Sequence, residues 1–185
     1  MESEMDHIMD VVTHQMPAAD IPCIMIGGHA VNHYGVIRAT QDVDFMIAAA
    51  DADAVQRIMR DAGFTNIAVH ETVMFFNQPE SPLRVDFLKV EQDTMQKLLA
   101  HAVTATYAGK DNVLIPQLSD LLAMKLYALT TGGPKRMDKD SSDIVNLVIE
   151  NQVDVETDLK SLCHDFGSEA VYSALRARIE ELRNG

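Results

Sequence analysis

Short apolar runs alternate with amphipathic repeats along the first 116 residues of the chain. Apolar or alternating runs between turn-forming residues predict strands, and apolar residues three and four positions apart predict helices. The predicted strands are 21–26, 42–48, 65–70, 73–78 and 83–90, followed by a hairpin that turns at Gly109 and Lys110. The predicted helices are 3–16, 29–35, 51–63 and 93–102, with Asp51 as an expected N-cap.

The pattern changes near Pro116, because only helical periodicity follows it. Helices are predicted at 117–130, 140–151, 155–166 and 168–183. The segment 131–143 carries three cations and is predicted to be a basic loop near the substrate or a solvated connection. The expected fold is α+β, a mixed β-sheet flanked by helices and followed by a helical C-terminal half, with domains at 1–116 and 117–185.

Composition narrows the classes of protein. The net charge of −13 over 185 residues disfavours binding to duplex DNA, which needs clustered Lys and Arg. Two distant cysteines do not make a disulfide framework, and the acidic N-terminus lacks the apolar region of a signal peptide. The apolar runs are too short to span a bilayer. We therefore expect a cytoplasmic protein without a membrane partner.

Asp42 and Asp44 are two residues apart in a predicted strand, so they share one face. Two adjacent carboxylates repel, and no Lys or Arg within the strand compensates them. Mg²⁺ would, because it prefers carboxylate oxygens and keeps substrate phosphate among its ligands. The alternative is a strand with one solvated face.

Asp86 lies in a second apolar strand, "LRVDFLKV". If that strand lies beside 42–48, three carboxylates meet on one face and can hold two cations for an in-line phosphoryl displacement. One of them can also take a proton from an attacking hydroxyl. The alternative for Asp86 is an ion pair with Arg84.

Gly27 and Gly28 stand where a predicted strand meets a helix N-terminus, a place at which backbone N–H groups can bind phosphate. A simple turn is the alternative. His29 and His33 share a helix face, which raises a zinc site, but the pattern lacks the glutamate of H-E-x-x-H and a third ligand. We interpret one or both as polar surface or pocket-rim residues.

Cations near these carboxylates are further candidates. Arg38 and Thr40 precede the acidic strand, and Arg38 can hold a triphosphate or pair with an aspartate. Lys125 lies among apolar residues of a predicted helix, where a lysine commonly extends its ammonium to solvent.

"IMIGGHA", "DVDFMI" and "LRVDFL" together resemble the DNA-polymerase-β-type nucleotidyltransferase superfamily. The stretch "GGHAVNHYGVIRATQDVDF" is most similar to the abortive-infection toxin type and to small antibiotic nucleotidyltransferases. The later "AMKLYAL" and "KRMDKDSSDIVNL" resemble their helical Lys and Lys-Asp-x-x-Asp. The similarity covers residues 20 to 150. His29 departs from the small or apolar residue usual after the glycines, and it either touches the nucleotide or faces solvent.

The resemblance implies transfer of a nucleoside monophosphate from an NTP to an acceptor, with release of pyrophosphate. Asp42, Asp44 and Asp86 are then the Mg²⁺ ligands, with two ions during turnover and Asp86 as the base. Lys139, Asp140 and Asp143 would shape the far wall of the pocket. Nucleotide contacts are implied for Gly27, Gly28, Arg38, Thr40, Lys125 and Lys139. Small molecules, tRNA ends and proteins are acceptors in the resembling group. The alternative is a catalytically silent member that binds a nucleotide or a partner.

Overall fold

The chain forms two compact units. The computed structural model describes residues 3–132 and 134–184. The first unit combines the residues up to Ala30 with Ala39–Gln117, and the second combines Val31–Arg38 with the chain from Leu118 onward. The short segment 31–38 therefore groups with the helical part of the chain, although it precedes the acidic strand in sequence.

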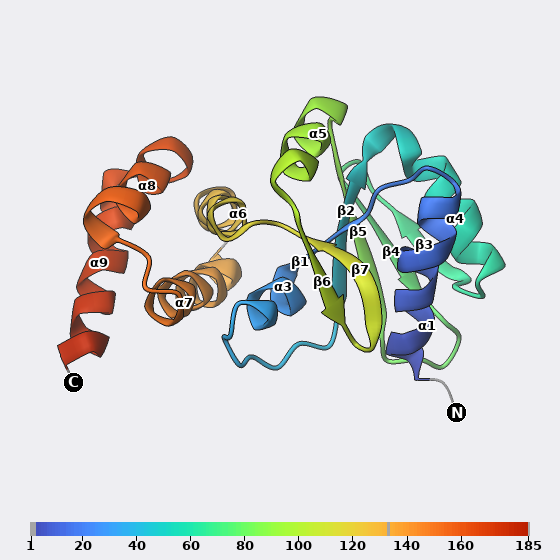
Figure 1. The fold of residues 1–185 in the computed structure, drawn as a ribbon, viewed down its shortest axis with the longest axis horizontal. Helices are drawn as coiled ribbons and strands as arrows, with labels where there is room; N and C mark the ends of the chain where they lie inside the picture. The colour runs from blue at the N-terminus through green and yellow to red at the C-terminus, as the bar shows by residue number, and fades with distance from the viewer. Residues whose placement is uncertain (1–2, 133, 185) are drawn as a thin grey trace. The chain divides into compact units, whose positions relative to one another are not determined.

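A seven-stranded mixed sheet forms the first unit, in the order β3-β4-β5-β2-β1-β7-β6 (Figure 1). The pairs β2–β5 and β1–β7 are parallel and the other neighbours are antiparallel. The predicted α+β fold with a mixed sheet is confirmed. The strands are β1 (Ile24–Ile26), β2 (Val43–Ala48), β3 (Asn66–Val69), β4 (Val73–Asn77), β5 (Arg84–Val90), β6 (Val103–Tyr107) and β7 (Lys110–Ile115).

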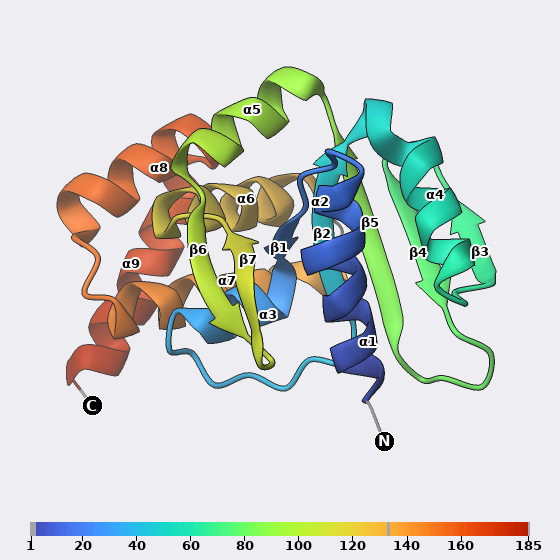
Figure 2. The same ribbon diagram turned by 45° about the vertical axis from the view of Figure 1, so that its right-hand side comes forward.

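Helices α1 and α4 cover one face of this sheet (Figures 1 and 2). The His7 ring of α1 bonds through Nε2 to the Ala62 carbonyl after α4, at 2.8 Å. Val43 and Phe45 are fully buried, and so is the apolar side of each helix. Because buried positions are occupied by apolar residues, the strand and helix patterns could be recognised in the sequence. The helices of this unit are α1 (Glu4–Asp10), which continues to α2 (Met16–Ala18), α4 (Ala52–Asp61) and α5 (Gln92–His101). Helix α3 (Gly27–His33) begins in this unit, and its last residues group with the second unit.

Asp51 stands at the predicted N-cap position of α4 but does not cap the helix with its side chain. Its side chain makes no capping hydrogen bond, and its backbone is in the right-handed helical region with φ −88° and ψ −5°. A capping residue normally has extended backbone. Here a 3₁₀ turn over Ala49–Asp51 leads into α4, so Asp51 already lies within helical backbone.

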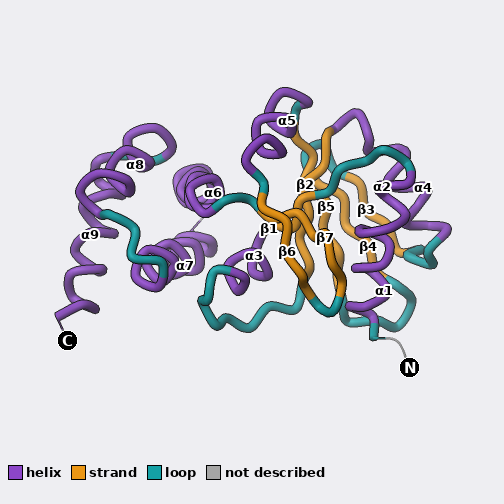
Figure 3. The backbone as a smooth tube through the Cα atoms, in the orientation of Figure 1, coloured by secondary structure: helices purple, strands orange, loops and turns teal. Residues whose placement is uncertain are grey.

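The second unit is helical in its described residues (Figure 3). Its helices pack as neighbours: α6 contacts α7 and α8, and α9 contacts α7 and α8. Asn151 Nδ2 donates to the Tyr34 carbonyl at 3.0 Å, which ties the segment 31–38 to the end of α7. The helices are α6 (Leu118–Thr131), α7 (Pro134–Glu150), α8 (Lys160–Phe166) and α9 (Glu169–Asn184).

The segment 131–143 is not the predicted basic loop. Helix α7 begins at Pro134 and continues to Glu150, so most of that segment is helical. Proline suits the first helical position because its missing N–H would have no partner there. Along the described residues, no helix has the length and apolar character needed to cross a membrane.

Candidate active site

The acidic residues of two strands come together at the centre of the first unit's sheet. β2 and β5 are parallel neighbours, with Asp44 opposite Asp86 and Val43 opposite Val85. Asp42 directly precedes β2 and lies on the same side as Asp44. The predicted neighbourhood of these two strands is confirmed. The carboxylates occupy one face, while Val43 and Val85 point to the other face and are fully buried.

Arg84 bonds to two of these carboxylates. Its Nε donates to Asp86 Oδ1 at 2.7 Å, and its Nη2 donates to Asp86 Oδ2 at 2.9 Å and to Asp42 Oδ2 at 2.8 Å. The guanidinium also lies over the Phe75 ring, 5.1 Å from its centroid. The hydrogen bond to Asp86 is the main reason that the pKa of Arg84 lies above its usual value.

The expectation that the acidic pair is uncompensated is therefore wrong for Asp42. The compensating cation comes from the neighbouring strand, where no pattern within residues 42–48 could reveal it. The ion pair between Asp86 and Arg84, the open alternative for Asp86, is present. Asp86 needs such a partner, because its side chain is only 10% exposed, against 44% for Arg84.

Gly27 packs directly against Asp44. Its φ is +65°, and a Cβ at this position would lie 2.7 Å from Asp44 Cγ and 2.9 Å from Asp44 Cβ. The glycine thus serves two physical needs, a left-handed backbone and close approach to a carboxylate. This gives a structural reason for the first glycine of the pair. Its proposed contact with nucleotide phosphate stays a prediction, as does that of Gly28.

We expect Gly27→Ala to destabilise the protein more than Gly109→Ala. Gly109 has a similar φ of +72° but nothing within 4 Å of the added Cβ. Both substitutions carry the strain of a left-handed backbone, about 1–2 kcal/mol, and only Gly27→Ala must also displace Asp44. Thermal melts of both variants and the parent test this. Equal losses would show that Asp44 yields without cost and that the close approach is unimportant.

His29 is buried, at 6% exposure, and its Nδ1 is hydrogen-bonded to the Tyr107 hydroxyl. The two rings meet edge to face with centroids 5.5 Å apart. His29 therefore does not face solvent. The expectation of a polar surface residue is confirmed for His33, which is exposed.

The arrangement of the acidic side chains bears on metal binding. Within residues 3–132 and 134–184, no group of three or more His, Cys, Asp or Glu side chains is arranged to hold a metal ion. Asp42, Asp44 and Asp86 nevertheless fit Mg²⁺ by donor chemistry, because carboxylate oxygens on one face are its preferred protein ligands. In this structure Arg84 bonds to Asp42 and Asp86 in the manner of a counterion.

Buried charges also form a network in the second unit. Lys125 Nζ bonds to Asp140 Oδ1 at 3.0 Å and to Asp143 Oδ2 at 2.7 Å, and Arg38 Nη1 bonds to Asp143 Oδ2 at 3.2 Å. Lys125, Asp140 and Asp143 are all less than 9% exposed. Lys125 therefore does not extend its ammonium to solvent. Arg38 takes the second of its two predicted options, with Asp143 as the partner.

The loop before β2 and helix α7 carry the remaining candidates for nucleotide contact. Asn32 accepts from the Arg38 backbone N–H at 3.1 Å and donates to its carbonyl at 2.9 Å, which sets the backbone of the loop. In the first unit, Thr40 Oγ1 donates to the Asp42 carbonyl at 3.2 Å. Lys139 is exposed on α7. Nucleotide contacts by Arg38, Thr40, Lys125 and Lys139 remain predictions.

The sequence patterns did not indicate the roles of two residues in this region. Phe75 supports the Arg84 guanidinium because it stands opposite Asp86 in the β4–β5 register. Tyr107 is the partner of His29 from a strand 78 residues later. Both depend on strand pairing across the sheet, for which the sequence carries no local signal.

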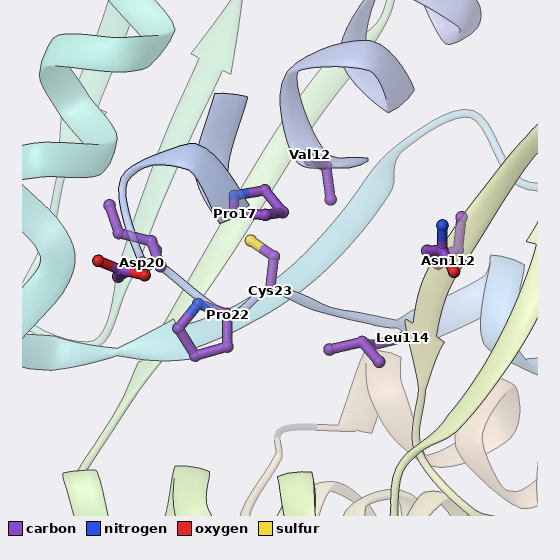
Figure 4. Close-up of a pocket in the computed structure, with 9 residues that line it drawn as sticks. Val12, Pro17, Asp20, Pro22, Cys23, Asn112 and Leu114 are labelled. Atoms are coloured by element: carbon purple, nitrogen blue, oxygen red, sulfur yellow. The ribbon is translucent and has the colours of Figure 1, made fainter. Parts of the chain in front are cut away.

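A separate hollow of about 300 Å³ lies at the opposite end of β1 (Figure 4). Its lining is mostly apolar and includes Val12, Pro22, Cys23 and Leu114. Cys23 precedes the residue paired with Met46, whereas Asp44 pairs with Ile26 at the other end of the strand. This hollow is thus distinct from the carboxylates. Burial raises the pKa of the Cys23 thiol, which disfavours the thiolate form.

Comparison with known proteins supports the fold. No family model matches the sequence, and no curated protein matches it. Among solved structures, the antibiotic-resistance enzyme ANT(2″)-Ia in complex with adenylyl-2″-tobramycin is similar with a TM-score of 0.64 and 12% identity, over 95% of this chain and 99% of that chain. Lincomycin-bound lincosamide antibiotic adenylyltransferase LnuA is similar with a TM-score of 0.54 and 17% identity, over 80% and 96%.

An antigenic nucleotidyltransferase-like protein from Paracoccidioides brasiliensis is similar with a TM-score of 0.55 and 19% identity, over 92% of this chain and 91% of that chain. The chain therefore has the fold of the nucleotidyltransferase superfamily. Its solved neighbours include antibiotic nucleotidyltransferases.

Proposed function

We propose that the protein is a Mg²⁺-dependent nucleotidyltransferase that moves a nucleoside monophosphate from an NTP to an acceptor and releases pyrophosphate. The observation that carries the proposal is the alignment of Asp44 with Asp86, with Asp42 on the same face, on a fold shared with nucleotidyltransferases. Three carboxylates at one point of a sheet are costly to assemble without a cation. A bound metal–nucleotide complex would supply that cation.

The proposed chemistry depends on position and charge. Mg²⁺ held by Asp42 and Asp44 would neutralise the triphosphate and its leaving group. Asp86 would accept the proton of the attacking acceptor group, and its low exposure favours a role that needs exclusion of water. The missing side chain of Gly27 leaves room for the Asp44 carboxylate.

The acceptor is proposed to be a small molecule with a reactive hydroxyl. One of the similar structures has lincomycin bound, and another is in complex with adenylyl-2″-tobramycin. A cationic small molecule would also suit a protein with a net charge of −13. The same net charge disfavours a long nucleic acid as the acceptor.

Pyrophosphate release tests the proposal. The parent, incubated with Mg²⁺, each NTP and a panel of hydroxyl-bearing acceptors, is expected to release pyrophosphate with at least one pair. Asp86→Asn should lower that rate by roughly 10²–10⁴, the usual contribution of a general base. Asp61→Asn, at an exposed position on α4, is the matched control and should keep the parent rate.

A silent nucleotide-binding member is the second candidate, and Arg84 is the observation that favours it. Its guanidinium already compensates Asp42 and Asp86, as a structural ion pair would. Tight NTP binding in the absence of pyrophosphate release, across all NTPs and acceptors, would support this candidate over the enzyme.

A further inference from the structure

Arg84 has unusually complete support for an exposed arginine. Both oxygens of Asp86 and one oxygen of Asp42 accept its hydrogen bonds, at 2.7–2.9 Å. The register places Phe75 opposite Asp86, so that its ring lies beneath the guanidinium. Charge-assisted bonds that engage two donors of the guanidinium are among the strongest in proteins. The arrangement holds Arg84 over the carboxylates rather than in solvent.

The same oxygens are those that a divalent cation would need. Asp86 is 10% exposed at its side chain and Asp42 is 39% exposed, so a cation that binds them directly approaches from the side on which Arg84 lies. Two cations on the same carboxylates repel each other. Arg84 and a divalent cation therefore compete.

Resting on the proposed function, we propose that Arg84 is a built-in counterion that holds Asp42 and Asp86 in the metal-free protein and is displaced when a divalent cation binds. Because the Arg84 contacts must break when the cation binds, their free energy is subtracted from the free energy of metal binding. Its benefit is that the buried Asp86 carboxylate is compensated in both states. Arg84 thereby sets the metal concentration at which the carboxylates become available.

The test is a titration with Mn²⁺ followed by electron paramagnetic resonance, which measures bound metal without turnover. Arg84→Gln is expected to bind Mn²⁺ about tenfold more tightly than the parent or better, because loss of one charge-assisted bond corresponds to about that factor. Arg84→Lys, which keeps the charge without the planar fork, should fall between them. Arg57→Gln, an exposed arginine on α4, is the matched control and should match the parent.

Phe75→Leu keeps every charge, so it tests the role of Arg84 even if the Arg84 variants misfold. Loss of the ring beneath the guanidinium should tighten Mn²⁺ binding by roughly two- to fivefold, the range of one exposed cation–π contact. Unchanged or weaker Mn²⁺ binding by folded Arg84→Gln, beside a parent that binds Mn²⁺, would overturn the counterion role and leave the proposed function intact. No Mn²⁺ binding by either protein would overturn the metal site itself, and this inference with it.

Discussion

Asp44→Asn is expected to abolish the thermal stabilisation that Mg²⁺ and NTP give the parent, without lowering the melting temperature of the protein in chelator. A ligand at 100 times its dissociation constant stabilises a protein by about 2.7 kcal/mol. For a chain of this size that is a rise of roughly 5–11 °C. Asparagine keeps the shape of the side chain beneath Gly27, and it removes one of three neighbouring negative charges.

Asp42→Asn removes the other proposed ligand of the same ion and is measured beside Asp44→Asn. Asp42 pairs with Arg84 at positions that are 39% and 44% exposed, so loss of that pair should cost less than about 1 kcal/mol in chelator. If Asp44 serves only the packing of the glycine turn, the Asp44→Asn variant will melt lower in chelator and keep its ligand stabilisation. If Mg²⁺ and NTP stabilise Asp44→Asn as strongly as the parent, Asp44 is not a metal ligand.

Lys125→Met is expected to lower the free energy of unfolding by about 3–5 kcal/mol, because it leaves buried carboxylates without their shared cation. Lys125 bonds to both Asp140 and Asp143, and all three are nearly inaccessible. Methionine keeps most of the apolar stem, so the loss reports on charge. At 2–4 °C per kcal/mol, the melting temperature should fall by roughly 10 °C.

Two variants separate this explanation from a role in nucleotide binding. Lys125→Met combined with Asp140→Asn should recover part of the lost stability, because Arg38 still pairs with Asp143. Lys139→Met changes an exposed lysine on α7 and should melt within about 0.5 kcal/mol of the parent. A Lys125→Met variant of parental stability with a raised KM for NTP would instead support the predicted phosphate contact.

Much of the fold was predictable from sequence because its strands carry short apolar runs and its helices carry amphipathic repeats. The strand at Val43–Ala48 is one example, since all its residues but Asp44 are buried and it therefore carries a near-continuous apolar run, and the strand at Lys110–Ile115, which follows the turn at Gly109, is another. The start of α7 was missed, because the polar run before Asp143 looks like a loop and the buried pairing of Asp140 and Asp143 with Lys125 stabilises it as helix.

The acidic residues of the candidate site were predictable, and their partners were not. Spacing alone places Asp42 and Asp44 on one face, and an apolar strand around Asp86 marks it as a neighbour. The pairing of β2 with β5 brings Arg84 to these carboxylates. Arg84 was foreseen as a partner of Asp86 two residues away, but its bond to Asp42 crosses between strands. Such contacts depend on register, which single-sequence patterns do not specify.

A crystal structure with Mn²⁺ and a non-hydrolysable NTP would show whether Asp42 and Asp44 bind the metal, since Mn²⁺ is located by its anomalous scattering. The account predicts a Mn²⁺ peak within coordination distance of Asp42 and Asp44, the triphosphate bound to that ion, and the Arg84 guanidinium moved away from Asp42. A nucleotide bound elsewhere, with Arg84 still bonded to Asp42 and Asp86 and no anomalous peak at the carboxylates, would contradict it.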